Sequence, residues 1–407
     1  MKKVKNNLQR VCCLVLTLLL LLPVGMPYME SVAAEAGLPS DTVECSAAVY
    51  CGTTGESPAT GEQPVPGPHT RLPARPPHRG NHPVLLGAES SQKNGTLMLV
   101  PGGMPFGVRM QSKGLMIVGL SEVKTGGVAT RPAYDGGIRV KDILLEIDGK
   151  AVTTAEEATA AIAAGEGRPL TMTVLRGDAR MNFTVTPKKC DESGTYRCGL
   201  YLRDTTSGIG TLTFFDPSSG LFGGLGHGVC DADTGTLVPL SYGTVLPVRI
   251  TGVVRGEAGK PGELRGALGG KRLGSLVTNS ECGVFGLLTE KPTTAQKALP
   301  VADASEVQEG EATLLCTLGE DGVCSYTVEI SNIDHGGRPT KSFTVHVTDE
   351  KLLSRTGGIV QGMSGSPLIQ NGKIIGAVTH VLIDDPTSGY GIFIGNMLSA
   401  MKMRAVA

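Results

Sequence analysis

The chain has no tryptophan, and aromatic residues make up only 4% of its 407 residues. Its 37 basic and 38 acidic side chains leave a net charge of −1, so it lacks the basic surplus that nucleic-acid binding requires. None of its 10 cysteines forms the close CxxC pair typical of zinc sites, and we expect no metal and no cofactor. Helix-forming runs are few and glycines number 57, which predicts a mainly β fold of short strands and tight turns.

Residues 1–36 are predicted to be a signal peptide or membrane anchor rather than part of the fold. Basic side chains precede an apolar run, residues 11–24, whose length suits a signal peptide better than a bilayer span. Small residues at positions that a peptidase could cut follow this run: Ala33, Ala34 and Ala36. The pattern predicts export across a membrane, where the cysteines outside the leader could form disulfides.

Three further regions differ in composition. Residues 37–95 are predicted to be a flexible linker, because stretches such as "GEQPVPGPHT" are too rich in proline and glycine to bury a core. Residues 96–188 mix short strands with one helix. In residues 196–407, short apolar strands recur between glycine turns, and this region is long enough for two small β-barrels.

Residues 96–188 contain a recognisable order of elements. The strand and Asp-Gly turn of "GIRVKDILLEIDGKAV" precede "TTAEEATAAIAA", where Thr154 and Glu157 have the spacing of a helix capping box. These residues resemble a PDZ domain, which is an α+β fold. The resemblance implies that Phe106, Gly107 and Val108 form the loop whose backbone N–H groups hold the C-terminal carboxylate of a peptide. Its ligand would be a free protein C-terminus or a segment of the chain itself, unless the groove binds nothing.

A serine in a glycine-rich loop, within "GGIVQGMSGSPLIQNGKIIGAV" (residues 357–378), is the strongest candidate for a nucleophile. Gly362 and Gly365 allow a tight turn that presents the hydroxyl of Ser364. The backbone N–H groups of Gly362 and Ser364 could then form an oxyanion hole. Behind the loop, Asn371-Gly372 fits the two-residue turn of a β-hairpin.

This arrangement of strand, serine loop and hairpin looks like the nucleophile segment of chymotrypsin-like serine proteases. Two residues depart from the usual Gly-Asp-Ser-Gly-Gly-Pro: Met363 replaces the acid, and Ser366 replaces the second glycine. No ion pair can therefore form from the position before the nucleophile. An ordinary glycine-rich turn is the alternative interpretation.

A serine nucleophile needs a base, and histidines 227, 335, 346 and 380 lie in the same region. His227 is favoured, because the glycines that flank it in "LGHGV" leave it free to face a cleft. His380 is the rival, since it follows the hairpin strand near the expected cleft. His346 is expected to face solvent, opposite the apolar residues of its strand, and His335 is expected to lie in a turn.

Asp349 is the favoured acid to orient the base. It ends a strand on the same side as the apolar residues of that strand, where a carboxylate needs a partner. The alternative is that Asp349 caps the short helix "EKLLS" that follows it. Asp231 and Asp233 are further candidates, because they lie close to His227 in the sequence.

The leader, the linker, the PDZ-like part, "LGHGV", "HVTDEKLLSRTGGIVQGMSGSPLIQNGKIIGAVTHVL" and "GYGIFIGNML" are together similar to the SpoIVB peptidase family, the stage IV sporulation protein B serine proteases. The resemblance implies a triad of His227, Asp349 and Ser364 on a chymotrypsin-like double β-barrel. It also implies a serine endopeptidase exported from the forespore into the intermembrane space. There it would cut itself and the regulatory subunit of a membrane-embedded metalloprotease complex, so that a sigma factor precursor is processed.

Two other functions compete with this one. A catalytically inert PDZ scaffold would be expected to have lost a member of the Ser-His-Asp set, and labelling by a fluorophosphonate probe would separate it from an active enzyme. A quality-control protease of the HtrA type would carry its PDZ domain after the protease domain, whereas here the PDZ-like part comes first.

Overall fold

The computed structural model describes residues 43–46, 92–93 and 96–402. The predicted leader and almost all of the predicted linker lie outside the described residues. Strands dominate the described part, as the sequence predicts. None of the helices in these ranges is long and apolar enough to cross a membrane.

The first β-barrel is a ring of strands in which each one is hydrogen-bonded to the next. The order around the ring is β15 (Leu240–Val254), β17 (Gly274–Ser280), β18 (Gly283–Leu288), β14 (Leu221–Gly224), β13 (Leu200–Phe215) and β4 (Pro105–Leu120), which pairs back to β15. Phe106, Met110 and Phe222 are among the buried residues that fill it. The barrel is extended at β15 by β16 (Glu263–Leu268) and β1 (Val43–Ser46), and at β13 by β3 (Thr96–Pro101), which also pairs with β2 (Gln92–Lys93) and β19 (Leu299–Pro300).

The second β-barrel is closed by strands from the C-terminal part of the chain. Its order is β20 (Gly310–Thr317), β21 (Val323–Ser331), β22 (Phe343–Val347), β25 (Ser388–Phe393), β24 (Lys373–Val381) and β23 (Pro367–Gln370). The 3₁₀ helix η1 (Ala304–Glu306) precedes it, α5 (Glu350–Thr356) follows β22, and α6 (Ile394–Lys402) follows β25. The predicted double barrel is therefore confirmed.

The PDZ part is formed by the elements that lie between β4 and β13 in the sequence, and it has its own core. Its elements are β5 (Val123–Thr125), β6 (Val128–Thr130), α3 (Pro132–Asp135), β7 (Ile143–Ile147), β8 (Lys150–Ala151), α4 (Ala155–Ala164), β9 (Leu170–Arg176), β10 (Ala179–Val185), β11 (Lys188–Lys189) and β12 (Tyr196–Arg197). The predicted capping box is present, since the side chains of Thr154 and Glu157 each accept a hydrogen bond from the backbone of the other. The core residues Leu115 and Ile117 of β4 belong to this part.

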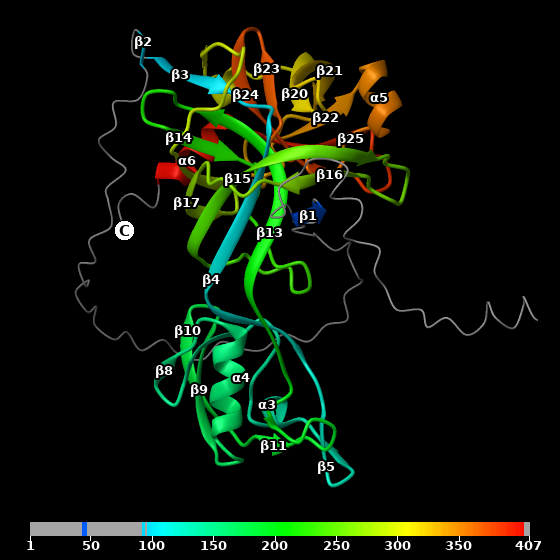
Figure 1. The fold of residues 1–407 in the computed structure, drawn as a ribbon. Coiled ribbons are helices and arrows are strands. Elements are labelled where there is room, and N and C mark those ends of the chain that lie inside the picture. Colours follow the sequence, from blue (N-terminus) through cyan, green and yellow to red (C-terminus); the bar gives the residue numbers. More distant parts are fainter. Residues whose placement is uncertain (1–42, 47–91, 94–95, 403–407) are drawn as a thin grey trace, which may run out of the picture. The chain divides into compact units, whose positions relative to one another are not determined.

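The PDZ part is inserted into the first barrel and does not simply precede it along the chain. β4 and β13 run side by side (Figure 1), with Pro105–Gln111 paired to Thr205–Thr211 in the barrel and Met116–Leu120 paired to Leu200–Arg203 beyond it. The barrel strand β4 thus precedes the PDZ elements in the sequence, and its partner β13 follows them. The protease fold begins before residue 112, within the region 96–188 that the sequence assigns to the PDZ domain.

This arrangement corrects the prediction that residues 106–108 form a carboxylate-binding loop. Phe106, Gly107 and Val108 lie in β4, where Gly107 pairs with Ile209 of β13 on one side and with Leu246 of β15 on the other. A carboxylate-binding loop needs backbone N–H groups that are free of sheet partners. Residues flanked on both sides by strands do not form such a loop, and Phe106, only 3% exposed, packs in the barrel core.

Candidate active site

The glycine-rich loop that carries Ser364 is held by two threonines of β13. Thr211 donates its hydroxyl to the carbonyl oxygen of Gly362 at 2.8 Å, and Thr213 donates to that of Gly365 at 2.8 Å. The backbone N–H of Thr211 also donates to the Ser364 carbonyl oxygen at 2.9 Å. A strand of the first barrel therefore fixes the nucleophile loop of the second. Neither threonine stands out in the sequence as a site residue, although their i, i+2 spacing in an apolar strand places them on one face.

The backbone of the loop leaves two N–H groups available at Ser364. Gly362 and Gly365 both have φ 95°, a conformation that favours glycine, and a side chain at Gly365 would collide with Thr211. Gly365 donates its N–H to Val378, whereas within the described residues the N–H groups of Gly362 and Ser364 have no protein acceptor. Two unpaired donors on either side of Met363 suit an oxyanion hole, which stays a prediction.

His227 is buried and held in one tautomer. Its Nδ1 lies 2.9 Å from the carbonyl oxygen of Gly228, which can only accept, so Nδ1 carries the proton and Nε2 keeps its lone pair. That is the form a general base requires. Burial lowers the pKa of His227 below its usual value of 6.5, and the hydrogen bond to Gly228 opposes this shift.

Residues of β24 bring the serine and two histidines together. The Ser364 hydroxyl donates to the carbonyl oxygen of Thr379 at 2.7 Å, and the ring of the next residue, His380, lies 5.0 Å from that of His227 between centroids. Among the described residues, no hydrogen bond joins Ser364 to either ring. Rotation of the Ser364 hydroxyl away from Thr379 would be needed before Nε2 of His227 could take its proton.

His380, the predicted rival base, therefore lies at the site as well. Its Nδ1 is buried without a hydrogen-bond partner in the described part of the chain. Burial, together with the neighbouring His227, lowers the pKa of His380 to about 3, so this ring is neutral at physiological pH. His227 remains the better candidate, since a carbonyl fixes its tautomer, whereas no hydrogen bond in the described residues fixes that of His380.

Asp349 occupies the N-cap of α5, which is the alternative role that the sequence left open. Its Oδ1 accepts from the backbone N–H groups of Lys351 at 2.9 Å and Leu352 at 3.1 Å, and its Oδ2 accepts from Thr327 at 3.3 Å. These partners account for both carboxylate oxygens, and no contact between Asp349 and His227 is found in the described residues. The orienting role of Asp349 stays a prediction that this geometry does not favour.

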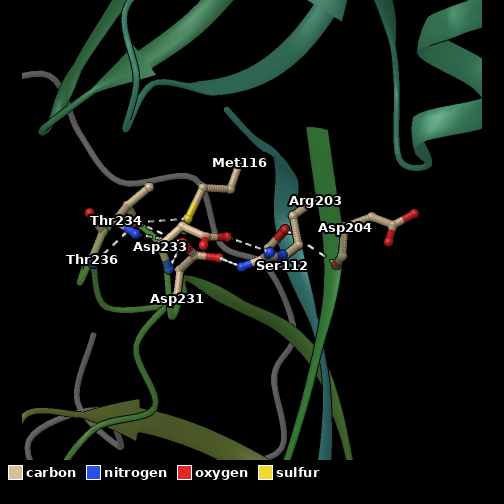
Figure 2. Close-up of polar contacts among 8 residues, drawn as sticks. All are labelled: Ser112, Met116, Arg203, Asp204, Asp231, Asp233, Thr234 and Thr236. Atoms are coloured by element: carbon tan, nitrogen blue, oxygen red, sulfur yellow. Dashed lines mark hydrogen bonds and ion pairs between the residues drawn. The ribbon is translucent and has the colours of Figure 1, made fainter. Parts of the chain in front are cut away.

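The other polar candidates also have partners of their own. Asp231 and Asp233 both bind Arg203 (Figure 2), and His346 is exposed, as predicted, with Nδ1 3.0 Å from the Ser388 hydroxyl. His335 stacks on Phe393, with ring centroids 5.4 Å apart. In the described residues, no group of three or more His, Cys, Asp or Glu side chains could hold a metal ion.

Comparison with known proteins gives one extensive match. The profile of a family described as SpoIVB peptidase S55 matches residues 194–398, and that of a PDZ domain matches residues 121–176. The family match begins after β4, so it leaves out the strand of the first barrel that precedes the PDZ elements.

Several solved structures are similar over parts of the chain. The PDZ domain of an SdrC-like protein from Listeria monocytogenes is 24% identical, with 22% of this chain and 87% of that chain covered, at a TM-score of 0.19. The active form of the Rv3671c protease from M. tuberculosis is 18% identical, with 48% and 73% covered, at a TM-score of 0.28. The HtrA-type protease AlgW with a decapeptide is 13% identical, with 49% and 52% covered, at a TM-score of 0.29.

Proposed function

The chain belongs to the SpoIVB peptidase S55 family and is a serine endopeptidase, and from that premise we propose that it acts in sporulation. In this proposal it is exported from the forespore into the intermembrane space. There it cuts itself and the regulatory subunit of a membrane metalloprotease, which starts the processing of a sigma factor precursor. The basic and apolar pattern of residues 1–36 supports export, by a cut signal peptide or by a membrane anchor.

The observation that supports the catalytic part is the path of contacts from Ser364 to Thr379, and from the next residue, His380, to the ring of His227. Beside Ser364, the N–H groups of residues 362 and 364 have no protein acceptor in the described residues. As Oγ of Ser364 bonds to the scissile carbonyl carbon, its proton passes to Nε2 of His227. The carbonyl oxygen becomes an oxyanion, which the N–H groups of Gly362 and Ser364 stabilise. The protonated His227 then gives its proton to the leaving amine, and the C–N bond breaks.

The acyl-enzyme is hydrolysed by the same groups. Water gives a proton to Nε2 of His227 and its oxygen bonds to the acyl carbon. The bond to Oγ of Ser364 then breaks, and the proton returns to that oxygen. The Gly228 carbonyl oxygen accepts from Nδ1 of His227 throughout, so Nε2 is the nitrogen that takes and gives the proton.

The experiment uses the purified full-length chain and the Ser364→Ala variant. Each is incubated with the recombinant regulatory subunit of the metalloprotease, and the fragments are identified by mass spectrometry. We expect cleavage of the subunit and of the chain itself only with the parent protein. Self-cleavage without cleavage of the subunit would overturn the proposed substrate while leaving the peptidase intact.

A second measurement addresses the biological role. In sporulating cells of the source organism, Ser364→Ala is introduced at the native locus and the sigma factor precursor is followed by immunoblot. Precursor that accumulates unprocessed is the expected result. Normal processing in cells that hold the inactive variant would contradict the proposal. Sequencing the N-terminus of the mature protein would test whether the leader is removed.

A further inference from the structure

Arg203 links two segments: the strand that returns from the PDZ part, and the loop that follows His227. It lies in β13, and its guanidinium binds two carboxylates of that loop (Figure 2). Nη1 pairs with Oδ2 of Asp231, and Nη2 lies 2.6 Å from Oδ2 of Asp233. At this point the pairing of β13 with β4 is irregular, with a register shift between Arg203 and Thr205.

Asp231 is fully buried, and its two oxygens have different tasks. Oδ1 accepts from the N–H and the hydroxyl of Thr234, both at 2.9 Å, and from the N–H of Asp233 at 3.2 Å. These bonds close a turn. Oδ2 accepts from Nη1 of Arg203, which is its cationic partner. Loss of the cation would leave the charge of Asp231 buried without a partner, which strongly destabilises the folded protein. Asp231 and its turn are therefore held beside Arg203.

The turn forms the tip of a short hairpin that begins just after His227, the candidate general base. The N–H of Val238 donates to the Val229 carbonyl oxygen at 3.0 Å, and Cys230 pairs with Leu237. Just before this hairpin, the Gly228 carbonyl accepts from Nδ1 of His227. A shift of the hairpin would therefore move the acceptor that fixes the tautomer and the ring orientation of the base.

We propose that Arg203 is a positioning residue for His227, which it holds through Asp231 and Asp233 from a strand shared with the PDZ part. The proposal rests on His227 as the base of the peptidase. It predicts that the loss of Arg203 reduces turnover more than substrate binding, since in the described residues the guanidinium binds only the loop after His227 and not the loop of Ser364. A misplacement of about 1 Å at a reacting group can cost about a hundredfold in rate.

The chain offers a matched control in the ion pair of Arg176 with Asp142. There Nε and Nη2 lie 2.7 Å from the two carboxylate oxygens. The side chains are 36% and 2% exposed, against 34% and 1% for Arg203 and Asp231. Arg176 belongs to β9 of the PDZ part and has no contact with the loop after His227 among the described residues.

The test compares Arg203→Gln with Arg176→Gln in the full-length chain, by steady-state kinetics on a peptide substrate and by the rate of fluorophosphonate labelling. We expect Arg203→Gln to lower kcat and the labelling rate by about tenfold to a hundredfold, with KM within about twofold of the parent value. Arg176→Gln is expected to keep both rates within about twofold. Equal losses in the two variants, or a change confined to KM, would overturn the proposal.

A second variant separates positioning from simple destabilisation. In Arg203→Gln/Asp231→Asn the buried charge is gone, and the asparagine Oδ1 still accepts the bonds that close the turn. We expect the melting temperature to recover toward that of the parent while kcat stays low. If kcat recovers together with the melting temperature, Arg203 only stabilises the fold. A His227→Ala variant with normal turnover would refute both this proposal and the assignment of the base, whereas the substrate experiment above would be unaffected.

Discussion

Replacing Phe106 by alanine tests whether the protease fold includes β4. The ring is almost completely buried, and it meets Phe222 edge to face with centroids 6.0 Å apart. It also covers Gly224, where a Cβ atom would lie only 2.7 Å from the ring. The change therefore opens a cavity between two strands of the first barrel, β4 and β14.

The size of the effect follows from the volume that is lost. Removing a buried phenylalanine side chain costs about 3–5 kcal/mol, out of a total unfolding free energy of about 5–15 kcal/mol. For a domain of this size, about 2–4 °C is lost per kcal/mol, so we expect the melting temperature to fall by about 6–20 °C. Peptidase activity should fall with it, since β13 also holds the nucleophile loop.

Thermal unfolding by circular dichroism and fluorophosphonate labelling at increasing temperature would measure both effects. Phe183→Ala is the matched control, because Phe183 is a half-buried residue of the PDZ part. This variant should leave the temperature dependence of fluorophosphonate labelling unchanged. The opposite pattern would refute the reasoning: if Phe106→Ala only weakened binding of a peptide with a free C-terminal carboxylate, residues 106–108 would be a PDZ loop after all.

Further predictions concern the site itself. Ser364→Ala should abolish labelling and self-cleavage, with kcat lowered by about 10⁶ and stability changed by about 1 kcal/mol, because one hydroxyl bond to Thr379 is lost; a purified variant that still trims itself would contradict this. His227→Ala should be as inactive as Ser364→Ala, and the double variant no worse, when kcat is compared; an active His227→Ala enzyme beside an inactive His380→Ala enzyme would make His380 the base. Asp349→Asn should keep near-normal kcat, since asparagine also caps helices, whereas an orienting carboxylate would lose at least about a hundredfold. The base must be neutral to act and burial lowers the pKa of His227, so the acid limb of the pH profile of kcat/KM should lie below pH 6.5, and a limb above pH 7 would argue against it.

Features governed by near neighbours in the chain could be predicted from the sequence. Asn371 and Gly372 have φ 51° and 73°, as the predicted hairpin turn requires. The capping box of α4 and the outward direction of His346 follow in the same way from spacing within a few residues. Each of these features depends on residues a few positions apart: a turn, a helix cap, or the alternation of buried and exposed side chains along a strand.

The pairing of β4 could not be predicted in this way. Its partners lie about a hundred residues further along the chain, as Gly107 and Ile209 do, and no local pattern records which strands will meet. A proline, a phenylalanine and a glycine in succession look the same in a loop as in a barrel strand. Asp349 is a related case, since the start of a helix and a triad member both call for a carboxylate at a strand end.

The insertion of the PDZ part between β4 and β13 has a consequence for how the protein folds during synthesis. β4 leaves the ribosome early, and it cannot join a barrel until β13 has been made. A PDZ part that folds in the interval brings Leu120 and Leu200 into register, which closes most of the intervening loop before the barrel forms. The order of folding would then be PDZ first, barrel second, and a destabilised PDZ part would slow the maturation of the protease even where it leaves the finished active site intact.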